Sequence, residues 1–242
     1  MKQQHFLTFM PAMTAFFAYL IPLFPLFSFI LLIFFGKRLG AKSAGVAIGA
    51  SFLSLLTAVP FVLGTLQGQS FVHHFEWLKL GRALLLFGVA IDSLSAMMLF
   101  VVTVVGTLII IYSVGYMRED PRFSRFFAYL SLFMFSMLTL VLANNLILLY
   151  ISWELVGLCS YLLIGFWFEK ESAANACKKA FVTTRVGDIC LFLGILILFF
   201  TTGTLEIRNL NHEFLQAYAG HSPALTLAAI LIFGGAVGKS AQ

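Results

Sequence analysis

An almost uninterrupted apolar run of 23 residues extends from Leu146 to Phe168 and reads LILLYISWELVGLCSYLLIGFWF. As a helix this run would be about 34 Å long, which is enough to cross the hydrocarbon core of a bilayer. Its one charged residue, Glu154, is nearly central and would therefore lie near the middle of the membrane. A carboxylate at that depth costs a few kcal/mol unless it is paired, hydrated or protonated. The run predicts a transmembrane helix, and Glu154 is its candidate functional residue.

The composition extends the membrane prediction to the whole chain. Hydrophobic residues make up 61% of the 242 residues and charged residues 10%, whereas soluble domains contain about 25% charged residues. The formal net charge of +5 does not indicate a nucleic-acid partner, because the 15 Lys and Arg residues lie in small groups between apolar runs. We expect a polytopic protein that is surrounded by the lipid bilayer and binds no nucleic acid.

Seven apolar runs predict an all-α membrane protein with about seven transmembrane helices. The runs cover residues 14–35, 43–66, 92–115, 126–143, 146–168, 176–202 and 223–237. Between the second and third runs, interleaved aromatic and charged residues within 67–91 predict a short extended hairpin at the membrane surface. A polar surface segment, residues 203–222, precedes the seventh run. Because no second soluble domain is visible, we expect residues 1–242 to form a single transmembrane domain.

Local signals refine the ends and contacts of these helices. Pro22 and Pro25 lie inside the first run, where a membrane helix tolerates proline if neighbouring groups satisfy the freed carbonyls. Asp92 and Ser93 are placed to cap the third helix, and Asn144–Asn145 form the whole turn before the fifth. Small residues in the second run would let another helix approach closely: Gly45, Ala47, Gly49, Ala50 and Ser51.

Charged residues inside the predicted helices are the candidates for chemistry. Glu154 has no cation within one turn of its own helix, so its partner must come from another helix or from water; the alternative is a protonated carboxyl bonded to a backbone carbonyl. Arg185 and Asp188 are three residues apart on the sixth helix and can neutralise each other, so they could also be a self-contained ion pair that fixes helix packing. Lys179 lies nearer the start of that helix and could extend to the membrane surface.

Lys239 closes a glycine-rich stretch, FGGAVGKSAQ, at the end of the seventh run. Gly234, Gly235 and Gly238 weaken a helix and favour a break. A broken helix at membrane depth exposes backbone groups that need a polar cavity, and such breaks mark ion sites in transporters. Lys239 would then be a mobile cation, although a lysine in this position is also compatible with an ordinary interfacial residue.

Cysteine and histidine positions give no sign of a metal or redox centre. Cys159, Cys177 and Cys190 lie in predicted membrane helices without CxxC spacing, so we expect buried thiols, no disulfide and no metal. The histidines lack ligand spacing, and the sequence contains no glycine-rich phosphate loop, CxxCH haem site or iron–sulfur cysteine cluster. We therefore expect no redox cofactor in this chain.

At these residues the sequence resembles the N-terminal part of the large antiporter-like membrane subunit of respiratory complex I, the NADH:quinone oxidoreductase. The family includes subunit L of the bacterial enzyme, subunit 5 of the mitochondrial enzyme and their plastid counterpart. The order and spacing of four segments carry the resemblance: RFFAYLSLF (125–133), NNLILLYISWELVGLCSYLLIGFWF (144–168), KAFVTTRVGD (179–188) and GGAVGKSAQ (234–242).

The resemblance implies a proton-translocating subunit in the membrane arm of an NADH or ferredoxin:quinone oxidoreductase. Such a subunit couples quinone reduction to proton transfer and is part of a translocase. Glu154 matches the essential glutamate of the family's fifth helix, and Lys239 matches the lysine in the break of the seventh. Arg185 and Asp188 match a modulating charge pair, to which we add Lys179. In this scheme a close Glu154–Lys239 pair holds the proton on the lysine, and opening the pair releases it.

The resemblance also implies partners, namely other membrane-arm subunits and especially another antiporter-like subunit. NADH, FMN, iron–sulfur clusters and quinone would be bound by partner subunits. The family continues past the GKSAQ motif with a second inverted repeat and a lateral helix, so we expect this chain to hold only the first part. The alternatives are the large subunit of a multisubunit Na⁺/H⁺ antiporter or related ion-translocating complex, and a non-transporting assembly piece. We expect a bacterial plasma membrane, with an organelle inner membrane or a thylakoid as the alternatives.

Overall fold

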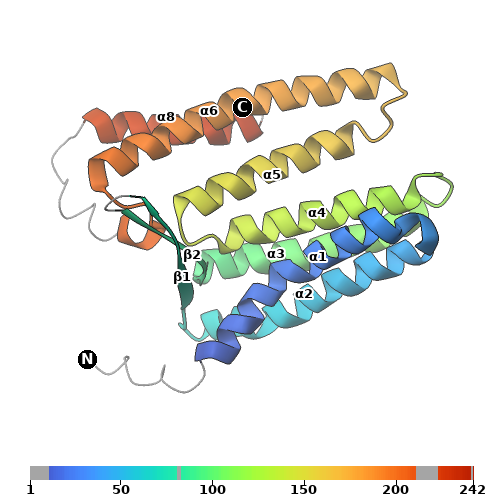
Figure 1. The fold of residues 1–242 in the computed structure, drawn as a ribbon, viewed down its shortest axis with the longest axis horizontal. Helices are drawn as coiled ribbons and strands as arrows, with labels where there is room; N and C mark the ends of the chain where they lie inside the picture. The colour runs from blue at the N-terminus through green and yellow to red at the C-terminus, as the bar shows by residue number, and fades with distance from the viewer. Residues whose placement is uncertain (1–10, 81–82, 211–222, 241) are drawn as a thin grey trace. The chain divides into compact units, whose positions relative to one another are not determined.

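The structure, a computed structural model, describes residues 11–80, 83–210, 223–240 and 242 (Figure 1), so the predicted surface segment 203–222 lies partly outside the described residues. The helices are α1 Pro11–Leu39, α2 Lys42–Leu66, α3 Ser93–Tyr116, α4 Phe123–Leu142, α5 Leu146–Ile164, α6 Glu171–Thr202 and α8 Pro223–Ser240, and the strands are β1 Phe71–Leu80 and β2 Ala83–Ile91. Seven helices in the described ranges are long and apolar enough to span a membrane. The predicted fold class is confirmed, and the protein is an integral, multi-pass membrane protein.

The chain divides into two compact units. The first comprises residues 1–73 and 89–142, and the second comprises residues 74–88 and 143–242. The first unit therefore contains α1 to α4, and the second contains α5, α6 and α8. The expectation of a single transmembrane domain stays a prediction.

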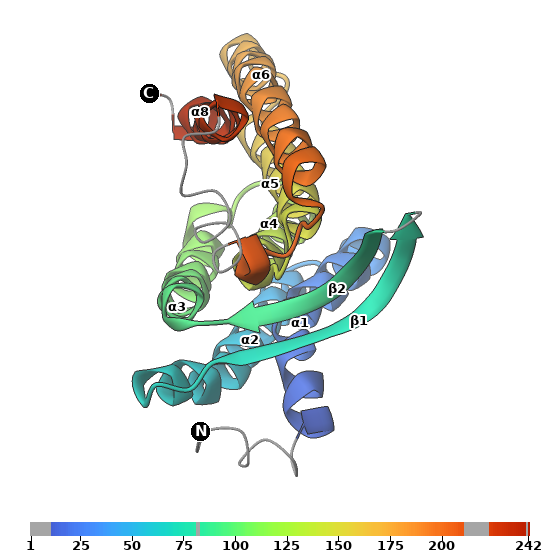
Figure 2. The same ribbon diagram turned by 90° about the vertical axis from the view of Figure 1, so that its left-hand side faces the viewer.

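The strands β1 and β2 pair as a two-stranded sheet, which confirms the predicted hairpin (Figure 2). Cross-strand aromatic contacts stabilise it, because the ring of Phe87 lies 5.4 Å from that of Phe75 and 5.8 Å from that of Trp77. The side chain of Asn145 donates a hydrogen bond to the carbonyl of Leu86. In the second unit this bond ties β2 to the N-cap residue of α5.

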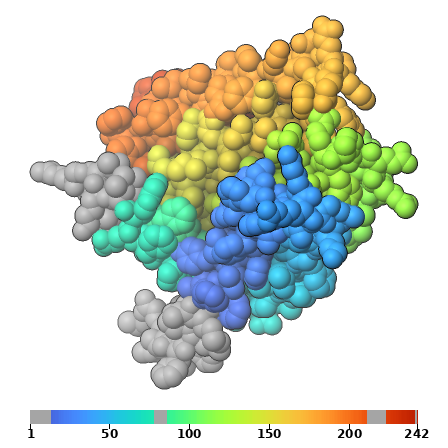
Figure 3. All heavy atoms as spheres, turned by 45° about the vertical axis from the view of Figure 1, so that its right-hand side comes forward, coloured from blue at the N-terminus to red at the C-terminus, as the bar shows by residue number. Residues whose placement is uncertain are grey.

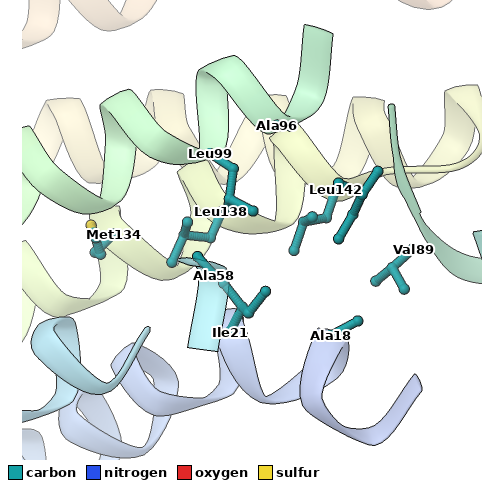
Figure 4. Packing of buried hydrophobic residues seen from close by; sticks show 10 residues of the cluster. Ala18, Ile21, Ala58, Val89, Ala96, Leu99, Met134, Leu138 and Leu142 are labelled. Atoms are coloured by element: carbon teal, nitrogen blue, oxygen red, sulfur yellow. The ribbon is translucent and has the colours of Figure 1, made fainter. Parts of the chain in front are cut away.

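The core of the first unit is an apolar cluster formed by its helices and the end of β2 (Figure 4). Its buried members are Ala18, Ile21, Ala58, Val89, Ile91, Ala96, Leu99, Met134, Leu138 and Leu142. Pro25 cannot donate to the carbonyl of Ile21, its helical partner, because proline has no amide hydrogen. The hydroxyl of Ser54 on α2 donates to that carbonyl over 2.7 Å instead. A neighbouring helix thus satisfies the proline-freed carbonyl, as predicted.

The helices α1 and α2 lie side by side on the surface of the first unit (Figure 3). Of the small residues predicted to allow close approach, Ala47 and Ser51 are buried on one face of α2. Gly45 and Gly49 have no atom within 4 Å of the position where a Cβ would be. For these two glycines the predicted contact is absent within the described chain, because they lie on the opposite, exposed face of the helix.

Local signals confirm the predicted start of α3 and explain why two other predicted boundaries, the end of α5 and the start of α6, were wrong. The Asp92 carboxylate accepts from the Ser95 amide while the Ser95 hydroxyl accepts from the Asp92 amide, a capping box that confirms the start of α3. The fifth helix ends at Ile164 instead of 168, because the chain turns at Gly165, the C-cap. The sixth begins at Glu171 instead of 176, because a glutamate at the helix N-terminus and the alanines after it favour helix, although the polar residues among them end the apolar run.

Candidate functional site

One face of α5 carries the central residues of the candidate site. Trp153 and Glu154 lie three and four residues after Tyr150, and four and three residues before Gly157, so the four residues share a face of this helix. Within the second unit, α6 packs against both α5 and α8. The side chains of α5 therefore meet the charged residues of the two other helices.

Glu154 is bound by a cation from another helix. The guanidinium of Arg185 on α6 forms a salt bridge with its Oε2 atom. The Tyr150 hydroxyl, one turn earlier on α5, donates to Oε1 over 2.7 Å. Only 21% of the Glu154 side chain is exposed. These two contacts therefore take the place of the water that would otherwise solvate a carboxylate in the middle of an apolar helix.

Asp188 is the most buried ionisable group of the site, with a side chain 1% exposed. Its Oδ1 accepts a hydrogen bond of 2.7 Å from the indole nitrogen of Trp153. Its Oδ2 accepts no hydrogen bond from the described residues and lies 3.9 Å from Arg185 Nη1. Arg185 thus lies between two carboxylates, and its guanidinium also packs 4.7 Å from the ring centre of Phe181.

Lys239 of α8 contacts the residue that precedes Glu154. Its Nζ atom donates to the backbone carbonyl of Trp153 over 3.2 Å and lies 5.4 Å from the centre of the Trp153 ring. No ion pair joins Lys239 to Glu154 in the part of the chain that the structure describes; Glu154 is paired with Arg185 instead. The charged groups are nevertheless connected through Trp153, which contacts both Lys239 and Asp188.

The predicted break before Lys239 is wrong for the described chain, because α8 is an unbroken helix from Pro223 to Ser240. A Cβ on Gly187 of α6 would lie 3.0 Å from the Cα of Gly238, and one on Gly235 would lie 2.7 Å from the Cβ of Leu191. These glycines let the two helices approach closely, and the packing offsets their low helix propensity. Close contact with α6 keeps α8 helical up to Lys239.

Lys179 lies apart from this cluster. Its side chain is exposed, and no ion pair of its ammonium is found among the described residues. The structure therefore brings together Glu154, Arg185, Asp188 and Lys239 but not Lys179.

Three further residues belong to the site that sequence reasoning did not identify: Tyr150, Trp153 and Gly157. Tyr150 and Gly157 lie four before and three after Glu154, so helical periodicity alone could have placed them on its face. The contacts that Trp153 makes had no such signal, because they depend on the rotation of α6 and α8 against α5.

The four charged groups balance, since Glu154 and Asp188 are acids and Arg185 and Lys239 are bases. With all four ionised the site is formally neutral, which lowers the cost of placing it in a bilayer. Of the residues described, no group of three or more His, Cys, Asp or Glu is arranged to hold a metal ion. The chemistry that the site offers is proton exchange between acids and bases on neighbouring helices.

Comparison with known proteins identifies a family that covers the same part of the chain. Residues 143–242 match a family described as NADH:quinone oxidoreductase/Mrp antiporter, TM, and residues 77–127 match the N-terminus of chain 5 of NADH-ubiquinone oxidoreductase (complex I). The matched ranges include all four charged residues of the site.

Similar curated proteins come from photosynthetic organisms. The chain is 51% identical over 181 residues to NAD(P)H-quinone oxidoreductase chain 5 of a Synechocystis strain, covering 73% of this chain and 27% of that protein. It is 46% identical over 210 residues to the chloroplastic subunit 5 of Zygnema circumcarinatum, covering 85% of this chain and 30% of that protein. The chain thus spans less than a third of the length of these relatives.

Solved structures share the fold at lower sequence identity. A chain of the Mrp complex from a Dietzia strain matches with a TM-score of 0.78 and 21% identity, over 93% of this chain and 24% of that chain. A chain of the membrane-bound sulfane sulfur reductase, an archaeal respiratory membrane complex, matches with a TM-score of 0.76 and 18% identity, over 91% and 44%.

Proposed function

Because the chain belongs to the antiporter-like family of membrane subunits that occur in NADH:quinone oxidoreductases and Mrp antiporters, we propose that it takes part in proton translocation driven by quinone reduction. The observation that carries the proposal is the neutral cluster of two acids and two bases on α5, α6 and α8. Transmembrane helices rarely carry ionisable side chains without a transport or binding role.

In this proposal Arg185 has two alternative positions. It is bound to Glu154, and its Nη1 atom is only 3.9 Å from Asp188. A modest change of the side-chain torsions would move the guanidinium fully onto Asp188, whose Oδ2 has no hydrogen-bond donor among the described residues. We propose that Arg185 alternates between the two carboxylates.

Each position of Arg185 has a different effect on Lys239. While Arg185 neutralises Glu154, this carboxylate does not attract the Lys239 ammonium, which contacts the carbonyl and the ring of Trp153 instead. When Arg185 turns to Asp188, the charge of Glu154 is uncovered and stabilises the ammonium form of Lys239. In this proposal Glu154 is the electrostatic partner and Lys239 carries the proton, while Arg185 and Asp188 modulate the pair.

The proposal assigns the redox steps to other subunits. The relatives are named as single subunits of NAD(P)H-quinone oxidoreductases, which supports membrane-arm neighbours. We propose that a second antiporter-like subunit is one of them. NADH or ferredoxin oxidation, FMN, iron–sulfur clusters and quinone reduction would belong to those partners. Lys179, which is exposed at the polar end of α6, would act at most from a distance.

A cation/proton antiporter subunit is the second candidate function, because the matched family model includes Mrp antiporters and the fold matches a chain of an Mrp complex. The identities of 46% and 51% are to quinone oxidoreductase subunits, which favours the first function. A requirement for Na⁺ in the external medium would instead favour the second.

The test uses the complete complex in liposomes, with proton uptake followed by a pH-sensitive dye during quinone reduction in Na⁺-free buffer. Glu154→Gln keeps the size of the side chain but removes its charge, so we expect proton uptake per quinone reduced to fall sharply. The matched control is Glu171→Gln, which makes the same change at an exposed position in the first turn of α6. Normal uptake by Glu154→Gln, in complexes with a normal content of this chain, would refute the proposed role.

A further inference from the structure

Gly157 lies directly beneath the ammonium group of Lys239. A Cβ added at Gly157 would lie 2.8 Å from Lys239 Nζ, which is closer than real Cβ atoms come to a neighbour. Gly157 is buried, and Lys239 Nζ is the atom within 4 Å that a side chain there would meet. The absence of a side chain at this position therefore makes room for the ammonium group.

The same glycine opens access to the carbonyl that Lys239 uses. In a regular α-helix the carbonyl of Trp153 accepts the amide hydrogen of residue 157, four positions later. A carbonyl has a second lone pair, which here accepts from Lys239 Nζ over 3.2 Å. A side chain on residue 157 would stand beside that oxygen and shield it.

Trp153 supplies a second attraction for the same group. Its ring centre lies 5.4 Å from Lys239 Nζ, within the range of a cation–π interaction, and tryptophan is the strongest partner for such contacts. Its indole nitrogen is held by Asp188 over 2.7 Å, which fixes the orientation of the ring. The ring, the carbonyl and Gly157 enclose the ammonium from one side.

We propose that Trp153 and Gly157 form a seat for the ammonium group of Lys239 and that Gly157 is a positioning residue for proton transfer. This inference rests on the proposed function. The seat holds the proton carrier one residue away from Glu154 while Glu154 is bound to Arg185. Lys239 thereby stays in reach of Glu154 throughout the exchange, and its ammonium does not move into the lipid.

The test compares two Gly→Ala variants of equal steric demand. Gly157→Ala displaces the end of a flexible lysine, so the helices can stay in place while the ammonium moves. Gly106→Ala on α3 is the matched control, because its Cβ would lie 2.7 Å from Met134 Sδ, the flexible part of an uncharged side chain. Both variants are made in the complete complex, and proton uptake is measured in H₂O and in D₂O.

We expect Gly157→Ala to slow proton uptake by about 10- to 100-fold, the range expected when a reacting group is misplaced by an ångström. The ratio of the rates in H₂O and D₂O should rise, since proton transfer at Lys239 becomes limiting. Poor assembly alone would lower both rates equally and leave the ratio unchanged. Gly106→Ala should change neither the rate per assembled complex nor the ratio.

A second variant covers the case in which Gly157→Ala does not assemble. Trp153→Leu keeps the carbonyl but removes the ring, and we expect a raised isotope ratio from it as well. An unchanged ratio in both assembled variants, or an equal effect of Gly106→Ala, would overturn the seat. If Glu154→Gln abolishes uptake while Gly157→Ala does not affect it, the seat fails and the proposed function stands; if Glu154→Gln has no effect, the proposed function itself fails.

Discussion

Arg185 offers the sharpest test of whether charge balance holds the site together. Replacing it with Gln leaves Glu154 and Asp188 with only Lys239 to balance them, so the cluster carries a net negative charge. At 3.9 Å and an effective dielectric constant of about 20, the attraction between Arg185 and Asp188 is about 4 kcal/mol. The desolvation of both ions offsets part of this attraction. The 36% exposure of Arg185 weakens the attraction further.

We therefore expect Arg185→Gln to destabilise the second unit by about 2 kcal/mol, between the values for exposed and buried ion pairs. This loss corresponds to about a 30-fold rise in the equilibrium constant for local opening of the second unit. The double variant Arg185→Gln/Glu154→Gln restores formal neutrality, so it should recover most of the loss. Arg208→Gln, which removes an exposed arginine of the same unit, should have little effect.

The assay is maleimide labelling of Cys159, a fully buried thiol on α5, in the purified complex. Mass spectrometry of the peptide that contains Cys159 isolates its labelling rate from that of other cysteines. Labelling should be about 30-fold faster in Arg185→Gln and near the wild-type rate in the double variant. Equal labelling of the single and double variants would refute the charge argument and indicate that Arg185 acts by packing on Phe181.

Two further predictions concern the first unit, each read out by thermal unfolding of the purified complex. The hydrogen bond from the Ser95 amide holds the pKa of Asp92 below its ordinary value. Asp92→Ala should therefore lower the free energy of unfolding by about 1 kcal/mol at pH 7. The wild type has this extra stability in full above the ordinary pKa of Asp and should lose it as the pH falls through the lowered pKa. A difference that stays constant down to acid pH would contradict this. Ser54→Ala should lower the free energy of unfolding by about 1–3 kcal/mol, because the Ile21 carbonyl loses its hydrogen-bond donor. Adding Pro25→Ala should recover part of this stability, since alanine restores the amide donor to that carbonyl. If the double variant recovers none of it, the hydroxyl does not stabilise the protein through this bond.

The transmembrane helices and their caps could be predicted from the sequence because those signals are local. Apolar length alone gave the number of spans, and Asp92 is followed by a serine at the spacing of a capping box. The end of α5 was misplaced because apolar residues continue past Gly165, although the chain turns there. Hydropathy reports where a segment can be buried and does not report where its backbone stops being helical.

The contacts of the site depend on how helices rotate against one another, and local spacing does not contain that information. The charged residues were found because a charge inside an apolar helix is conspicuous, but the pairing of Glu154 with Arg185 follows from the register between α5 and α6. The continuous α8 was missed for a related reason, since helix propensity describes an isolated segment. Gly235 and Gly238 lower the helix propensity of an isolated segment. In the folded protein, the close packing of α6 on these two glycines compensates for it.

The zero net charge of the site limits how it can handle protons. Adding a proton to Glu154 or Asp188 leaves one uncompensated positive charge, and removing one from Lys239 leaves one uncompensated negative charge. Either imbalance is expensive within hydrocarbon. Arrival at an acid and departure from a base are therefore favoured as simultaneous events, and we expect such a cluster to pass protons singly, with each one expelled by the next.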